Sequence, residues 1–133
     1  MTQQDKLKIN AHDSILLLEP WIKSSMRHIA RHPDRPDLAI YGTGYNSWGV
    51  QTQQKAFAAF AVVATHPEYS KERTGMTQAD LIELTLALLR FNLESHWVGT
   101  ISCMDMTSWG HTWISVLGLE RMMHGVAALD AYL

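Results

Sequence analysis

The tripeptide Ser-Trp-Gly occurs twice in this chain, at residues 47–49 and 108–110, and each copy stands before a long apolar run. The copies are 61 positions apart, and one further helical pattern lies between them. A repeat of this size is typical of a duplicated two-helix unit, whose hairpins stack to bury a shared core. The spacing therefore predicts two helical hairpins in tandem, with one helix of each beginning at a Ser-Trp-Gly copy.

Two segments have apolar residues at three- and four-residue steps and charged residues between them, which predicts amphipathic helices over 13–31 and 77–96. Pro20 lies inside the first segment and either kinks the helix or begins it. This helix is expected to end before Pro33, because the residue preceding a proline is pushed out of the helical region. Thr77 begins a near match to a capping box, which marks the start of the other helix.

Two further segments, 48–65 and 109–132, carry apolar residues on all sides and are expected to be buried helices. No strand pattern is found. Half-exposed and buried helices in alternation favour an all-α fold of two α/α hairpins, with outer and inner helices, that forms part of an α/α-toroid-like array. A plain four-helix bundle is the alternative, although its helices should all be about equally amphipathic.

The 133 residues are enough for one all-α domain over 1–133. The helical pattern continues to Leu133 without a cap, so a fragment of a larger toroid is the other interpretation. A net charge of −2 gives no reason to expect nucleic acid, and no stretch is long and apolar enough for a membrane span. Residues 1–10 lack a signal core, so the protein is expected to be cytoplasmic if Met1 is the natural start.

Cofactor signatures are missing from the sequence. Cys103 is the single cysteine and cannot form an internal disulfide. His28 and His32 are four positions apart, but arginines surround them and would repel a cation. No zinc, di-iron or phosphate-loop motif is present, so we expect no metal and no cofactor.

If the two hairpins stack in register, the two buried helices begin at the same end of the molecule and share one mouth. Trp48 and Trp109 would flank that mouth, and Ser47 and Ser108 would cap the helices. Free backbone N–H groups and the helix dipole favour an anion there, and indole faces suit a sugar ring. Packing of each tryptophan on a neighbouring helix is the competing interpretation.

The runs at residues 41–49 and 109–115 resemble the openings of inner helices in α/α-toroid carbohydrate-active enzymes. Over residues 13–132 the chain resembles the heparinase II/III-like polysaccharide lyases. The resemblance implies a carbohydrate-active domain that binds an acidic oligo- or polysaccharide, or cleaves it by β-elimination.

A lyase of this kind must neutralise the uronate carboxylate, remove the C5 proton and protonate the leaving oxygen. Asn46 could perform the first task, and His111 or Tyr45 the other two. The competing interpretation makes 42–46 a turn-rich connection. The residues expected to bind substrate are Trp48, Gln51, Trp109, Trp113, Glu120 and Arg121.

Glu120 and His124 are four positions apart, on the same stripe as Trp113, in a helix expected to have no solvent side. One interpretation is a buried structural ion pair, with Arg121 bonded to a neighbouring helix. The other places both side chains in the lower part of the toroid's central cleft. In the cleft, His124 would be a further acid/base candidate.

A different class of function is also compatible with the pattern. The chain would then be a non-catalytic helical interaction module, or a four-helix bundle that self-associates into a homo-oligomer. Under the lyase hypothesis the rings of Trp48 and Trp109 face one open cleft, which separates the two classes.

Overall fold

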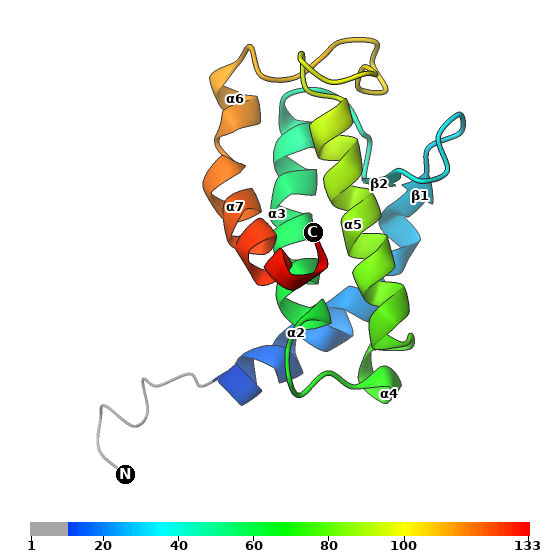
Figure 1. Cartoon of the computed structure of the whole chain (residues 1–133), viewed down its shortest axis with the longest axis vertical. Helices are drawn as coiled ribbons and strands as arrows, with labels where there is room; N and C mark the ends of the chain where they lie inside the picture. The colour runs from blue at the N-terminus through cyan, green and yellow to red at the C-terminus, as the bar shows by residue number, and fades with distance from the viewer. Residues whose placement is uncertain (1–10) are drawn as a thin grey trace.

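The computed structural model describes residues 11–133 and is mostly helical (Figure 1). The polar segment 1–10, considered above for a signal core, lies outside the described residues. The elements follow in the order α2 (Ala11–Ser25), η1 (Met26–His28), β1 (Ile29–Arg31), β2 (Ala39–Tyr41), α3 (Trp48–Ala64), α4 (Lys71–Thr74), α5 (Gln78–Glu94), α6 (Trp113–Val116), α7 (Leu119–Ala128) and η2 (Asp130–Tyr132).

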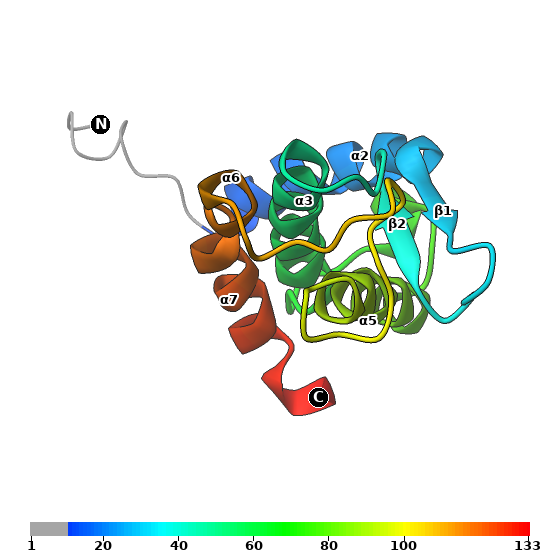
Figure 2. The ribbon, with the colours of Figure 1, turned by 90° about the horizontal axis from the view of Figure 1, so that it is seen from above.

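Helix α3 lies at the centre and contacts α2, α5, α6, α7 and β2. Figure 2 shows it between α2 on one side and α5 and α7 on the other. In Figure 1, α3 and the α6–α7 segment begin at the same end and run in the same direction, and α5 runs the opposite way. The predicted helices over 48–65 and 77–96 are confirmed, and Thr77 caps α5 by accepting a hydrogen bond from Asp80 N.

The main core forms where α3 meets α5 and α7, around Phe57, Phe60 and Leu88. The approach of α7 to α3 depends on Gly125. A Cβ atom added there would lie 2.7 Å from Phe57 Cε1 and 3.0 Å from Ala58 Cα, so any side chain would force the helices apart. Glycine therefore sets the distance between these two helices.

The sequence predicted no strands and a first helix over 13–31, and both expectations are wrong. Helix α2 passes through Pro20 and ends at Ser25, and β1 then pairs antiparallel with β2. Buried Gln53 supports β2 by accepting from Tyr41 N and donating to Ala39 O. The strand pair thus depends on a glutamine of α3. A residue pattern within the strands themselves does not include this glutamine.

The fourth helix also differs from its prediction over 109–132. It is divided at Gly118 into α6 and α7, and it begins four residues after Trp109. Met122 and Gly125 face the core, whereas much of the opposite side of α7 is exposed. This helix is therefore half-exposed rather than buried, because within residues 11–133 only one of its sides is covered.

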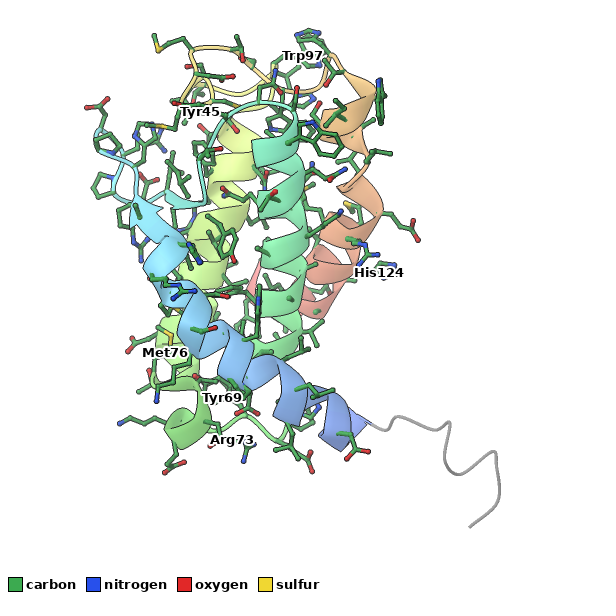
Figure 3. The ribbon with its side chains drawn as sticks, turned by 180° about the vertical axis from the view of Figure 1, so that it is seen from behind. Tyr45, Tyr69, Arg73, Met76, Trp97 and His124 are labelled. Carbon is green, nitrogen blue, oxygen red and sulfur yellow. The ribbon has the colours of Figure 1, made fainter. Side chains whose placement is uncertain are left out.

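The end of the molecule opposite the start of α3 is held by an ion pair between α2 and α4. Arg73 donates from Nε and Nη2 to the two carboxylate oxygens of Glu19, at 2.8 and 3.0 Å. Glu19 is fully buried, and Figure 3 shows Arg73 beside Tyr69 at this end. Among the described helices, none is both long and apolar enough to cross a membrane.

Candidate functional site at the aromatic end

Exposed aromatic side chains gather at the end of the molecule where α3 and α6 begin. The tryptophans Trp48, Trp97 and Trp113 are all more than half exposed, as is Tyr45. Figure 3 shows Tyr45 and Trp97 at this same end. We call these four residues together with His111 the aromatic end.

The rings of Trp97 and His111 lie side by side at the aromatic end. Their ring centroids are 5.8 Å apart and their planes differ by 34°. The backbone beneath is fixed, because Trp97 N donates to Trp109 O and Trp109 N donates to Ser95 O. Both rings therefore sit on a loop that is tied to the C-terminal end of α5.

Trp109 was predicted to share a mouth with Trp48, and the structure contradicts this. Trp109 is 3% exposed and contacts Val50 and Cys103, whereas Trp48 is 59% exposed. The Trp109 indole N–H donates to Asn92 O at 2.7 Å, so its polar atom is satisfied inside the protein. Trp109 is a core residue, and the two indoles do not face one open cleft.

The serines of the two copies do not cap helices. Ser47 has φ 65° and makes no side-chain capping bond to α3. Ser108 lies outside the fourth helix, where Thr112 is the cap and accepts a hydrogen bond from Ser115 N. The prediction of an anion site between two helix ends that Ser47 and Ser108 cap is therefore wrong.

Asn46 joins the two Ser-Trp-Gly segments. Its Oδ1 atom accepts from Ser47 N at 2.7 Å, and its Nδ2 atom donates to Ser108 O at 3.2 Å. Its backbone N also donates to Asp105 Oδ2. The side chain predicted to hold a uronate carboxylate thus already bonds within the protein, at both atoms of its amide.

Gln51 is buried one turn below Trp48 and accepts a hydrogen bond from Lys55 Nζ at 3.3 Å. Both side chains line a cavity of about 400 Å³ between α2, β2 and α3. Trp21 and Tyr41 form its aromatic wall, with ring centroids 6.3 Å apart.

Sequence reasoning missed Trp21, Tyr41, Lys55 and Trp97. Of these, Lys55 could most easily have been recognised from the sequence as a site residue. It is the only charged residue of α3 and follows Trp48 by two helical turns, so it lies on the same side of the helix. Trp97 comes directly after the predicted third helix, where nothing in the sequence indicates that it will lie beside His111.

The predicted pair of Glu120 and His124 is on the surface rather than buried. The side chains are 88% and 75% exposed, and Glu120 Oε1 lies 4.0 Å from His124 Nε2. Arg121 is exposed beside them. Figure 3 shows His124 away from Trp97 and Tyr45. Glu120, Arg121 and His124 are therefore not brought together with His111.

Over residues 11–133, no group of three or more His, Cys, Asp or Glu side chains could hold a metal ion. His32 Nδ1 accepts from the backbone N of Asp34 and of Arg35, and His28 lies against the ring of Tyr41. The Cys103 thiol is buried, and this burial raises its pKa, which disfavours the reactive thiolate.

The aromatic end can thus offer flat apolar ring faces together with hydrogen-bonding groups from Tyr45 and His111. No family model, no curated protein and no solved structure matches this chain.

Proposed function

We propose that the aromatic end binds a carbohydrate chain. The observation that carries this proposal is that four exposed aromatic residues lie at one end of the molecule: Tyr45 and Trp97, which Figure 3 shows there, and Trp48 and Trp113, which begin α3 and α6. Aromatic rings offer large, rigid apolar faces with a polar edge, which suits sugars because their C–H groups lie on the ring face and their hydroxyls at its rim. An exposed group of aromatic residues is otherwise unfavourable, so a binding role accounts for it.

The more specific proposal is that the glycan is acidic and is cleaved by β-elimination in an α/α-toroid-like array. Tyr45 and His111 support it, because both are exposed at the aromatic end and could transfer protons. The parallel course of α3 and α7, with α2 and α5 beside α3, is compatible with inner and outer helices. His124 would take no direct part, since it lies away from this end.

Titration of the intact chain with neutral and uronate-containing oligosaccharides, followed by calorimetry, tests the proposal. We expect Trp48→Ala and Trp97→Ala to abolish binding and Tyr132→Ala to leave it unchanged, because Tyr132 is a similarly exposed aromatic residue in η2. The appearance of the ultraviolet absorbance of an unsaturated uronide would support cleavage. Unchanged binding by both tryptophan variants would contradict the carbohydrate proposal.

The second candidate is a non-catalytic interaction module that self-associates. It is favoured by exposed apolar side chains on α2 and along the α6–α7 segment, including Leu17, Leu117 and Met123. Analytical ultracentrifugation over a range of protein concentrations separates the candidates. A mass that rises with concentration, together with no binding of any oligosaccharide, would favour this module.

A further inference from the structure

One stripe of α3 is uncovered within the described part of the chain. The sequence predicted that this helix is buried all round, but Thr52, Lys55 and Val62 are exposed and Ala59 is half-buried. These positions follow one another at three- and four-residue steps, so they lie on one face of the helix. The stripe begins below Trp48 and extends to the last turn of α3.

Two adjoining cavities follow this stripe and share three lining residues, so together they form one groove. The first has a volume of about 400 Å³ and the second about 270 Å³, and both are lined by Leu18, Lys55 and Ala59. Helix α2 lines both cavities, with Tyr41 of β2 in the first and Arg121 and His124 of α7 in the second. We call this groove the α3 trough; its lining residues are Leu18, Trp21, Tyr41, Gln51, Thr52, Lys55, Ala56, Ala58, Ala59, Val62, Arg121 and His124.

The trough has the size and floor that a helix requires. On α3 it extends from Gln51 to Val62, which at about 1.5 Å per residue is roughly 16 Å, or three helical turns. Three alanines form its floor, and such small side chains let the backbone of a second helix approach closely. The walls add larger apolar groups, Leu18 and Trp21 among them. A docked amphipathic helix buries its apolar face in a groove of this kind.

The charged side chains that line the α3 trough, Lys55 and Arg121, are both cationic. Among residues 11–133, no aspartate or glutamate lines either cavity, and His124 lines the second. Lys55 bonds only to the neutral amide of Gln51, and Arg121 has no ion pair within residues 11–133. His124 faces Glu120 from its own helix at 4.0 Å. Two cationic groups are thus available to acidic side chains of an occupant.

We propose that the α3 trough docks an amphipathic helix of a partner protein that is about three turns long and carries acidic residues beside its apolar face. The apolar face covers the alanine floor, and the acidic side chains meet Lys55 and Arg121. This interaction does not depend on the carbohydrate proposal, because it uses the side of α3 rather than the aromatic end. Charge complementarity of this type sets partner choice and association rate.

The test is fluorescence anisotropy with the full chain and a labelled designed peptide of about 14 residues, with leucines at positions i, i+3, i+4 and i+7 and glutamates on both flanks. A scrambled peptide of the same composition is the control ligand. We expect saturable binding of the designed peptide and weaker binding of the scrambled one. The double variant Lys55→Glu with Arg121→Glu should lose at least about tenfold in affinity.

The double variant Lys23→Glu with Lys71→Glu is the matched charge control, because it changes the net charge by the same amount, and both lysines are exposed and line neither cavity. It should bind like the unmodified protein, and so should Trp97→Ala. Ala59→Trp fills the floor and should abolish binding while the circular dichroism spectrum is retained. Equal binding of the two peptides, equal affinity of the charge variants, or absence of peptide binding would overturn the proposal. Occupation of the trough by a second copy or by anionic vesicles instead of the peptide would also overturn it.

Discussion

The two Ser-Trp-Gly segments have the same sequence and lie at the same end of the molecule, joined by Asn46, yet their tryptophans have opposite environments. Trp48 is the first residue of α3 and projects into solvent, whereas Trp109 precedes α6 and is enclosed by Val50 and Cys103. The tripeptide itself therefore decides neither burial nor helix start. The elements that cover each copy decide both, and substitutions at matched positions can measure the difference.

The largest expected difference is between the two tryptophans. Trp109→Ala removes a buried indole together with its hydrogen bond to Asn92, so it should lower the free energy of unfolding by about 3–5 kcal/mol. Trp48→Ala should change it by less than about 0.5 kcal/mol, because an exposed side chain loses few contacts. Urea denaturation measures both. Reaction of Cys103 with a thiol reagent should also accelerate in the Trp109 variant, and equal stability of the two variants would contradict the contrast.

The second largest difference in stability is expected between alanine substitutions of the two glycines that follow the tryptophans. Gly110 has φ 113°, and a Cβ atom there would lie 2.6 Å from His96 Nε2, so Gly110→Ala should cost about 1–3 kcal/mol of stability. Gly49 is in the first turn of α3, and its Cβ atom would meet only the rotatable hydroxyl of Thr43 at such short range. Gly49→Ala should therefore be nearly neutral, since alanine favours the helix. A thermal melt of each variant checks this, and a larger loss at Gly49 would contradict it.

Removal of the Asn46 side chain, which links the two segments, should lower stability by less. Asn46→Ala removes the hydrogen bonds to Ser47 N and Ser108 O, which should lower stability by about 1–2 kcal/mol. Hydrogen exchange measured by mass spectrometry should show faster exchange in both segments together. Faster exchange in the segment around Ser108 alone would mean that Asn46 does not couple them.

The smallest effect concerns the helix caps. Thr112→Ala removes the side chain that accepts from Ser115 N, and should cost about 1 kcal/mol. Ser108→Ala should leave stability unchanged, because Ser108 does not cap α6. Chemical denaturation of the two variants side by side gives the measurement. A cost at Ser108 equal to that at Thr112 would show that the serine has a structural role.

Local signals in the sequence were sufficient for α3 and α5. The capping threonine Thr77 and a long apolar body are properties of consecutive residues, and they predict both helices to within a few positions. The strand pair was not predictable in this way. Each strand has three residues, and β2 depends on Gln53, which follows it by twelve or more positions.

Exposure was harder to predict than helix position. The apolar composition of 109–132 predicted burial, but burial depends on how many neighbours a helix has, and α7 meets the core on one side only. For the site, Trp48 begins α3 as predicted, and the structure decides for exposure between the two environments that the sequence left open. The burial of Trp109 and the proximity of Trp97 to His111 result from the path of the loop after α5, which no local pattern specifies.

The hydrogen bonds at Asn46 have a consequence for the order of folding. Two of them, to Asp105 and to Ser108, connect residues 59 and 62 positions apart, so the intervening chain must be closed into a loop before these two can form. Loop closure costs entropy, which contacts along that chain must offset first. We therefore expect the pairing of α3 with α5 to come early and the assembly of the aromatic end to come last, as the final step that completes the folded state.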